Sequence, residues 1–187
     1  MGAMPATQHM TAEEFLRLPD TDDLRSAELV EGELIVDPPR ARHQLVAGEI
    51  LYALMTWSRS GEARGTVWHN LGVQLDERNV YQPDVLWYPG EVEVDLDARP
   101  PSPLPQIAVE VRSPSTWRFD IGAKKAAYER EGLRELWLVD TDAKVVLVFR
   151  RSTPSVGSFD VALEIDHTLT SPQLDGFELP LAELFPE

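Results

Sequence analysis

The sequence predicts one domain of the α/β (α+β) class, spanning residues 1–187, with a mixed β-sheet flanked by helices. Two observations predict this class. Helical and β-type segments follow one another along the chain, and several strands are apolar on both faces, as in sheets that helices cover. The length of 187 residues and the hydrophobic content of 43% are sufficient for a substantial core.

The N-terminal part predicts a short helix, a β-hairpin and a longer helix. The stretch "TAEE" at 11–14 has the pattern of a capping box, which opens a helix. "AELVEGELIVD" at 27–37 alternates on both sides of Glu31-Gly32 and predicts an N-terminal hairpin. Between residues 43 and 57, apolar residues recur at helical spacing, which predicts an amphipathic helix.

The middle of the chain predicts three strands. The first covers residues 65–76, and the second covers 79–89, where Pro83 indicates an edge position or a local break in the ladder. The acidic, proline-rich residues 90–105 predict a loop. Residues 106–112, "QIAVEVR", alternate and predict the third strand.

The C-terminal part predicts a helix, two strands and a final short helix. The first helix covers about residues 119–131 and ends at Gly132. "ELWLVD" and "KVVLVFRR" are apolar strands joined by a turn at residues 141–143, and burial on both faces is expected for them. The tail at 171–185 predicts a last short helix that packs onto the body.

The composition limits the classes of function. The formal net charge of -15 opposes tight, sequence-independent binding to a phosphate backbone. Because the chain has no cysteine, it has neither disulfides nor thiolate metal sites. No run approaches the roughly 18 apolar residues of a membrane span. The first twenty residues lack the apolar core of a signal peptide, so we expect a cytoplasmic protein.

Glu110 is the residue that most needs an explanation. The alternation of the third strand places it in an apolar run, and a buried carboxylate is costly unless it is paired, hydrogen-bonded or bound to a metal. An ion pair with Arg112 or Lys124 and a metal ion both satisfy this requirement. The strand alone does not distinguish them.

Other charged residues converge with Glu110 in this arrangement. Asp84 lies on the preceding strand, and Asp120 and Lys124 share one face of the following helix. Two carboxylates on neighbouring strands repel each other unless a cation lies between them. Because the chain lacks cysteine and its histidines are scattered, an oxygen-based site for Mg²⁺ or Mn²⁺ is favoured over a zinc site.

The ordered set of motifs resembles the Uma family of restriction-endonuclease-like proteins, within the PD-(D/E)XK nuclease superfamily. The resemblance covers about residues 10–186 and is carried by "AELVEGELIV", His43, "YQPDVLWYP", "VEVRSPST", "DIGAKKAAYEREGLRELWLVD" and "LTSPQLDGFELPLAELF". It implies the restriction-endonuclease-like core, a mixed sheet flanked by helices. It also implies metal-dependent nuclease activity.

The resemblance implies roles for individual residues. Asp84 and Glu110 would be catalytic metal ligands, the main-chain carbonyl of Val111 a third ligand, and Glu28 a further carboxylate at the site. Lys124 would be the catalytic lysine, and a one-residue shift in helix phase makes Lys125 the alternative.

One position departs from the usual superfamily pattern. Arg112 stands where a lysine usually follows the strand glutamate, and an arginine does not act readily as a base. The residues expected to contact phosphate or DNA are Arg112, Arg118 and Lys125.

Each assignment has a simpler structural alternative. Asp84 could cap its strand, Lys124 could be an exposed partner of Asp120, and a histidine such as His43 at a helix start is more often a cap or a surface residue.

The sequence therefore predicts a DNA endonuclease that hydrolyses phosphodiester bonds with a Mg²⁺-activated water. Cutting both strands of a duplex needs two sites, which a homodimer would supply. The main alternative is a catalytically inactive domain used for binding or assembly, which the acidity and the lack of a separate DNA-recognition module favour. A second alternative is a hydrolase of another phosphorylated substrate.

Overall fold

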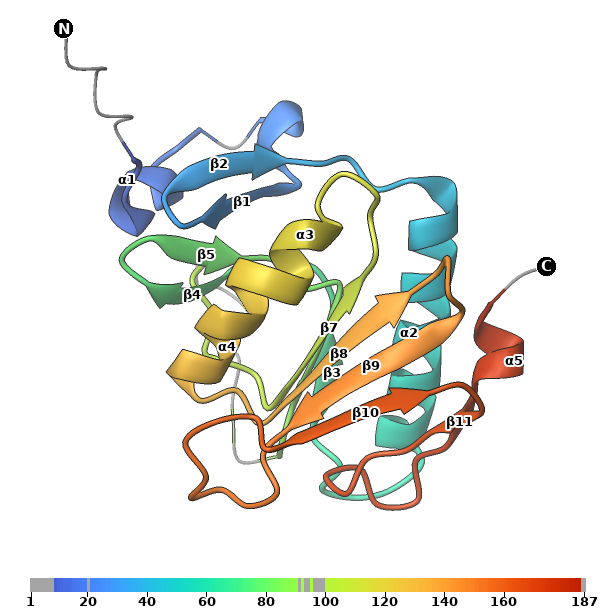
Figure 1. Ribbon diagram of the computed structural model, residues 1–187. Coiled ribbons are helices and arrows are strands. Elements are labelled where there is room, and N and C mark those ends of the chain that lie inside the picture. The colour runs from blue at the N-terminus through green and yellow to red at the C-terminus, as the bar shows by residue number, and fades with distance from the viewer. Residues whose placement is uncertain (1–8, 20, 91, 93–94, 96–99, 186–187) are drawn as a thin grey trace, which may run out of the picture.

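The computed structural model describes residues 9–19, 21–90, 92, 95 and 100–185, and its centre is a six-stranded mixed sheet (Figure 1). The strand order is β10-β9-β8-β7-β6-β3. Only β7 and β8 run parallel, and the other neighbours are antiparallel. The strands are β3 (Thr66–Trp68), β6 (Val85–Tyr88), β7 (Ile107–Val111), β8 (Glu135–Asp140), β9 (Val145–Arg150) and β10 (Val161–Ile165).

A second sheet of four strands has the order β2-β1-β5-β4. Its strands are β1 (Ala27–Val30), β2 (Glu33–Val36), β4 (Val73–Asp76) and β5 (Asn79–Tyr81). The expected hairpin is confirmed as β1 and β2, which pair antiparallel. Glu31 and Gly32 form its two-residue turn with φ angles of 53° and 85°, and Gly32 adopts the second angle without the steric cost of a Cβ.

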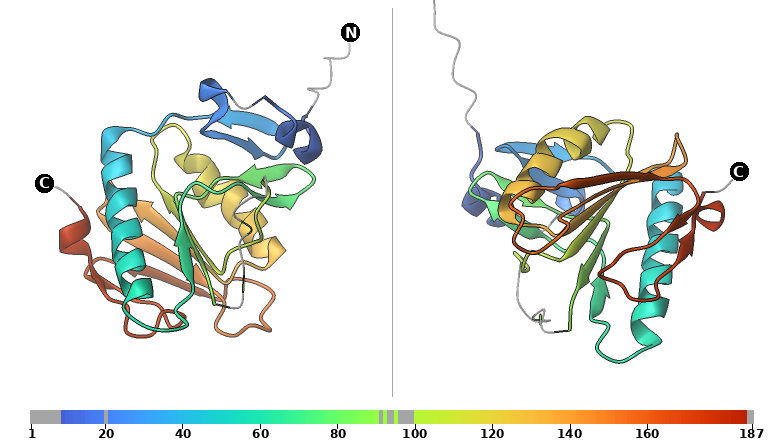
Figure 2. Two further views of the ribbon diagram at one scale, coloured as in Figure 1. Left: turned by 180° about the vertical axis from the view of Figure 1, so that it is seen from behind. Right: turned by 60° about the horizontal axis from the view of Figure 1, so that its bottom comes forward.

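Helices cover both faces of the six-stranded sheet (Figures 1 and 2). One face packs against α2 (Ala41–Arg59) and α5 (Leu181–Leu184), and its core includes Ile50, Val109 and Trp137. The opposite face packs against α4 (Lys125–Glu131) and the four-stranded sheet. Successive residues of β7 alternate between these two cores, so Ala108 and Glu110 point toward α4.

The remaining elements are short. A capping box at Thr11 opens α1 (Ala12–Leu16), as the sequence predicts, and a 3₁₀ turn η1 covers Asp22–Leu24. The strands β11 (Thr168–Leu169) and β12 (Leu179–Pro180) pair near the C-terminal helix, which is confirmed as α5. Among the described residues, no helix is long and apolar enough to cross a membrane.

The prediction of one continuous strand at 65–76 and another at 79–89 is wrong, because each segment forms two strands. Residues 65–76 divide into β3 and β4, and residues 79–89 divide into β5 and β6, with the two parts of each in different sheets. Asn70 lies between β3 and β4 with φ 52°, a left-handed conformation that turns the chain. Pro83 lies between β5 and β6 and has no N–H for a ladder, so its predicted local break is confirmed.

The helix predicted at about 119–131 begins earlier and is not uniform. It consists of α3 (Trp117–Phe119), a π-helical segment η2 (Asp120–Lys124) and α4. Its end at Gly132 is confirmed, and that glycine adopts φ 94°. The predicted loop at 90–105 is confirmed only in part, because residues 91, 93–94 and 96–99 lie outside the described residues. The strands β10, β11 and β12 were not predicted.

Asp140 ties the end of β8 to the neighbouring turn and strand. Its carboxylate accepts hydrogen bonds from Arg112 Nη1 at 2.7 and 2.9 Å and from the N–H groups of Asp142 and Ala143 at 3.0 Å each. Burial raises the pKa of Asp140, but the hydrogen bonds outweigh it and the pKa is lowered from 3.8. The ionised carboxylate therefore stabilises the fold above the pKa of the unfolded chain.

We predict that Asp140→Asn lowers the free energy of unfolding by about 2 kcal/mol at pH 7, because charged hydrogen bonds at one carboxylate are lost. The difference from the wild type should shrink as the pH falls through the lowered pKa, below 3.8, where wild-type Asp140 is also neutral. Urea denaturation at several pH values measures both effects. A difference that stays constant down to pH 2 would contradict this account.

Candidate active site

Asp84 and Glu110 come from neighbouring strands of the six-stranded sheet and line one pocket. Asp84 immediately precedes β6, and its N–H donates to the carbonyl of Val109 at 3.0 Å. Its carboxylate in turn accepts a hydrogen bond from the N–H of Val111 at 2.7 Å. Because Val85 pairs with Val109, Asp84 and Glu110 are the next residues along the two strands. Both line the same pocket.

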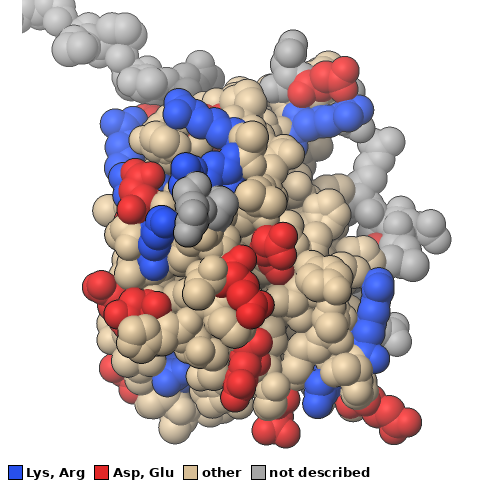
Figure 3. All heavy atoms as spheres, turned by 90° about the vertical axis from the view of Figure 1, so that its right-hand side faces the viewer, with Lys and Arg blue, Asp and Glu red and all other residues tan. Residues whose placement is uncertain are grey.

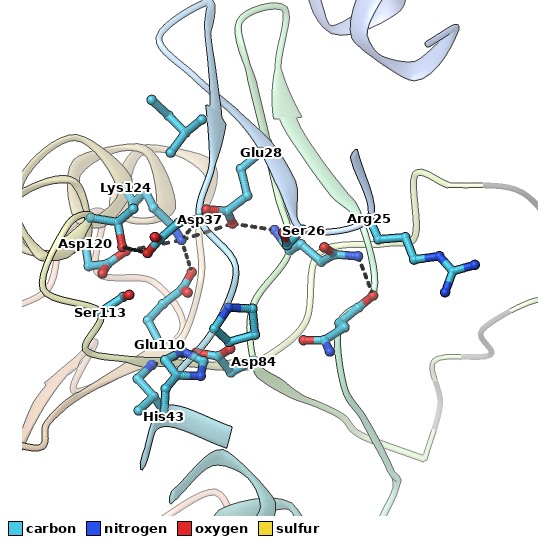
Figure 4. Close-up of a pocket in the computed structure, with 16 residues that line it drawn as sticks. Arg25, Ser26, Glu28, Asp37, His43, Asp84, Glu110, Ser113, Asp120 and Lys124 are labelled. Atoms are coloured by element: carbon cyan, nitrogen blue, oxygen red, sulfur yellow. Dashed lines mark hydrogen bonds and ion pairs between the residues drawn. The ribbon is translucent and has the colours of Figure 1, made fainter. Parts of the chain in front are cut away.

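The helical segment η2 supplies the cation of this site, Lys124. Its Nζ lies 2.9 Å from Glu110 Oε1, 3.2 Å from Asp120 Oδ1 and 3.0 Å from each carboxylate oxygen of Glu28 on β1 (Figure 4). One ammonium therefore joins three carboxylates from three elements. The expected pairing of Asp120 with Lys124 is present, but Lys124 is only 3% exposed, so the alternative of an exposed pair is wrong.

Further hydrogen bonds fix the carboxylates around Lys124. The Tyr128 hydroxyl donates to Glu110 Oε1 at 2.8 Å, and the N–H of Gln82 donates to Glu28 Oε1 at 2.7 Å. The ring of Tyr81 lies beneath the ammonium, with its centroid 5.3 Å from Nζ. Glu110 is thus satisfied by Lys124 and Tyr128, whereas Arg112, the other candidate partner, pairs with Asp140.

Burial and charge strongly perturb the proton affinities in this cluster. Burial lowers the pKa of Lys124, but Glu110, Glu28 and Asp120 outweigh it, so the pKa lies well above 10.5. Burial raises the pKa of Glu110 well above 4.5, and it raises the pKa of Asp120 to about 6 although Lys124 opposes both shifts. Lys124 is therefore an ammonium at neutral pH, and several buried carboxyl groups share this one cation.

His43 on α2 also belongs to this site, which the sequence did not predict. Its Nε2 lies 3.2 Å from Asp84 Oδ2, and its side chain is 12% exposed. Burial lowers the pKa of His43, but the hydrogen bond to Asp84 and the charge of that carboxylate raise it to a net value above 6.5. One signal was available: His43 precedes the buried Val46 and Ile50 on the same helical face.

A pocket of about 310 Å³ lies between the two sheets, η2 and the start of α2. The charged side chains that line it include Glu28, His43, Asp84, Glu110, Asp120 and Lys124. Asp37, Ser113 and Thr116 line it as well, and Thr116 and Ser115 hydrogen-bond to the carboxylate of Asp37. Arg25 lines the outer part of the pocket, and its guanidinium points away from the carboxylates in Figure 4.

The structure separates the other predicted cations from the pocket. Arg112 pairs with Asp140 and Asp142, at 2.7 and 3.2 Å. The Arg118 guanidinium lies 4.7 Å from the ring centroid of Phe119, and the Lys125 ammonium lies 4.7 Å from that of Phe149. Within the described part of the chain, none of the three predicted phosphate contacts lines the pocket. Of the two alternative lysines, Lys124 is the one that does.

The donor set is compatible with a hard divalent cation. Asp84, Glu110 and Val111 all line the pocket, and Mg²⁺ needs only one or two carboxylates beside water. Among the described residues, however, no three His, Cys, Asp or Glu side chains are grouped closely enough to hold a metal ion. The ammonium of Lys124 lies between Glu28, Glu110 and Asp120 instead. The metal-binding roles stay predictions.

The mixed sheet and the helices that cover its two faces also occur in a solved structure. A crystal structure described as "a putative nuclease belonging to DUF820 from Anabaena variabilis ATCC 29413" has the same fold, with a TM-score of 0.76 at 19% sequence identity. The match covers 94% of this chain and 97% of that one.

The family model Uma2, described as "Putative restriction endonuclease", matches residues 12–182, so the chain belongs to this family. The predicted resemblance and the predicted fold class are thereby confirmed. The description of this family supports a nuclease. The chain matches none of the curated proteins with which it was compared.

We predict that Tyr128→Phe lowers the free energy of unfolding by about 2 kcal/mol, because the buried hydrogen bond from the Tyr128 hydroxyl to the carboxylate of Glu110 is lost. Tyr88→Phe is the matched control, since the buried Tyr88 hydroxyl donates to the neutral carbonyl of Pro103 at 2.8 Å. That control should lose about 1 kcal/mol. Urea denaturation measures both variants, and a Tyr128→Phe protein as stable as the wild type would argue against this role.

Proposed function

We propose that this protein is a metal-dependent DNA endonuclease. The observation that carries the proposal is the convergence of Asp84, Glu110 and Lys124 on one pocket, from two neighbouring strands and the following helical segment. Five carboxylates line that pocket, and three of them, those of Glu28, Glu110 and Asp120, pair with the ammonium of Lys124. A phosphodiester anion would be repelled by that excess of negative charge, so a further cation is required for it to bind.

In this proposal Asp84, Glu110 and the carbonyl of Val111 hold Mg²⁺ or Mn²⁺. When bound, such a cation polarises a phosphoryl oxygen and acidifies a water molecule. The Val111 N–H and His43 both contact Oδ2 of Asp84, so they orient this carboxylate and leave Oδ1 for the cation. The Tyr128 hydroxyl orients the carboxylate of Glu110 in the same way, by its hydrogen bond to Oε1.

Lys124 would act as a donor rather than as a base. Its raised pKa keeps it protonated at neutral pH, so it cannot accept a proton from the attacking water. An ammonium at this position can orient that water and stabilise the negative charge that develops on the phosphoryl oxygens. Its pairs with Glu28 and Asp120 hold it near the pocket, so it needs little reorganisation to do so.

Phosphate contacts would come from cations other than those expected from the sequence. Arg25 lines the pocket, and the exposed Arg40 and Arg42 flank the start of α2, close in sequence to His43. On the face that carries α2 and α5, Lys and Arg side chains gather mostly toward the top, while acidic side chains run down the middle (Figure 3). A strand of DNA would therefore approach from the end of the molecule where α2 begins.

One observation favours a second candidate, a nuclease-fold domain used for binding or assembly. The buried pairs of Lys124 with three acids satisfy one another without any ligand, as in a structural ion cluster.

In the nuclease, cleavage of both strands would need two sites, which a homodimer would supply. Sedimentation would report that oligomeric state.

We predict that the wild type cleaves single- or double-stranded DNA with Mg²⁺ or Mn²⁺, and that Asp84→Asn and Glu110→Gln each lower the rate at least about 100-fold, because each removes a charged ligand. The matched control is Glu135→Gln. Glu135 is another fully buried carboxylate, but its partners are Trp137, Ser171 and Gln173, outside the pocket. This control should keep its cleavage rate, and circular dichroism should verify that each variant folds.

The outcomes separate the candidates. Cleavage by the wild type that both site variants lose supports the nuclease, whereas equal cleavage by all variants indicates a contaminating enzyme and argues against it. Metal binding without cleavage of DNA points to another phosphorylated substrate. A protein that neither binds metal nor cleaves DNA is the binding or assembly domain.

A further inference from the structure

We propose that Lys124 and the divalent cation compete for Glu110, so that metal binding is a cation exchange that moves the ammonium of Lys124 off this carboxylate. This inference rests on the proposed function, because it assumes that Glu110 is a metal ligand. It adds a different role for Glu28 and Asp120, which would hold the lysine rather than the metal.

The contacts of the ammonium carry this inference. Nζ has four carboxylate oxygens between 2.9 and 3.2 Å, and one of them belongs to Glu110. Its three protons are therefore all engaged by acids in a side chain that is 3% exposed. A second cation on Glu110 would be a near neighbour of this ammonium and would be repelled by it. The two cations are thus alternatives at Glu110.

Glu28 and Asp120 can hold the ammonium of Lys124 when it leaves Glu110. Glu28 presents both of its oxygens to Nζ and is itself held by the N–H of Gln82 at 2.7 Å. Asp120 lies one helical turn before Lys124, at 3.2 Å from Nζ. These two acids can keep the ammonium paired near the pocket, while Glu110 and Asp84 remain for the metal. Glu28 and Asp120 are then positioning residues for Lys124.

The charge of Lys124 favours the metal-free protein over the metal-bound one. Without Lys124, the carboxylates of Glu28, Glu110 and Asp120 would be buried without a partner cation, which is strongly unfavourable. The lysine therefore stabilises the metal-free protein and weakens its affinity for metal. Removal of the ammonium should make the same pocket more attractive to a divalent cation.

The test compares Mn²⁺ binding to the wild type, Lys124→Met and Lys125→Met by isothermal titration calorimetry without DNA. Lys125→Met is the matched control, because it removes the same charge at the next residue, where the ammonium lies over Phe149 and Phe159. We expect Lys124→Met to bind Mn²⁺ at least about tenfold more tightly than the wild type. The control should stay within about threefold of the wild type, because the ammonium of Lys125 lies outside the pocket.

Folding of Lys124→Met is itself informative. A variant that unfolds without metal and folds when MnCl₂ is added supports the exchange, because the metal then replaces the ammonium. A variant that stays unfolded at MnCl₂ concentrations that saturate the wild type overturns it.

A second measurement uses the wild type. The chain has only three lysines, at positions 124, 125 and 144, so ¹⁵N-lysine labelling gives few ammonium signals and the two variants assign them. Addition of MgCl₂ should shift the Lys124 signal and leave the other two unchanged. An unchanged Lys124 signal at saturating MgCl₂ overturns the inference.

These measurements separate this inference from the proposed function. Metal binding and DNA cleavage by the wild type, with no gain of affinity in Lys124→Met, would overturn the exchange alone. Absence of metal binding in both proteins would overturn both proposals. A Lys124→Met protein that binds metal more tightly but cleaves DNA more slowly supports both, because loss of a purely structural residue would not raise the affinity.

Discussion

The site depends on one interaction, the contact of the buried Lys124 ammonium with three carboxylates. Glu28, Glu110 and Asp120 come from a strand of the small sheet, a strand of the large sheet and a π-helical segment, and the ammonium holds all three together. Each acid alone would be costly at this depth. The position of the small sheet and of η2 against β7 is therefore coupled to the charge of a single side chain.

The two faces of strand β7 differ in polarity. The face toward α2 is apolar over Ile107, Val109 and Val111, while the face toward α4 carries Ala108 and then Glu110. The strand alternation thus places a carboxylate at the end of an otherwise apolar ladder without disturbing the opposite core. The π-helical segment contributes as well, because Asp120 and Lys124 are both buried within it. π-helical turns occur frequently at functional sites.

Arg112 occupies the position at which the sequence resemblance implies a lysine, and its side chain does not line the pocket. Its guanidinium is held by two contacts to Asp140, and it lies on the side of β7 toward β8 and the following turn. It therefore links β7 to the β8–β9 turn, and the cation of the pocket comes from a helix instead. The fold places the ammonium of Lys124, from the segment η2, beside Glu110 of β7.

Local pattern in the sequence determined the hairpin, α2, β7 and the β8–β9 pair, because alternation and helical spacing are properties of neighbouring residues. It also singled out Asp84, Glu110 and Lys124, since charges in apolar surroundings stand out in a sequence. Only the tertiary structure decided that residues 65–76 and 79–89 serve two sheets, that Arg112 pairs with Asp140, and that His43 reaches Asp84. Those outcomes depend on which distant segments pack together, and residue spacing carries no direct record of such contacts.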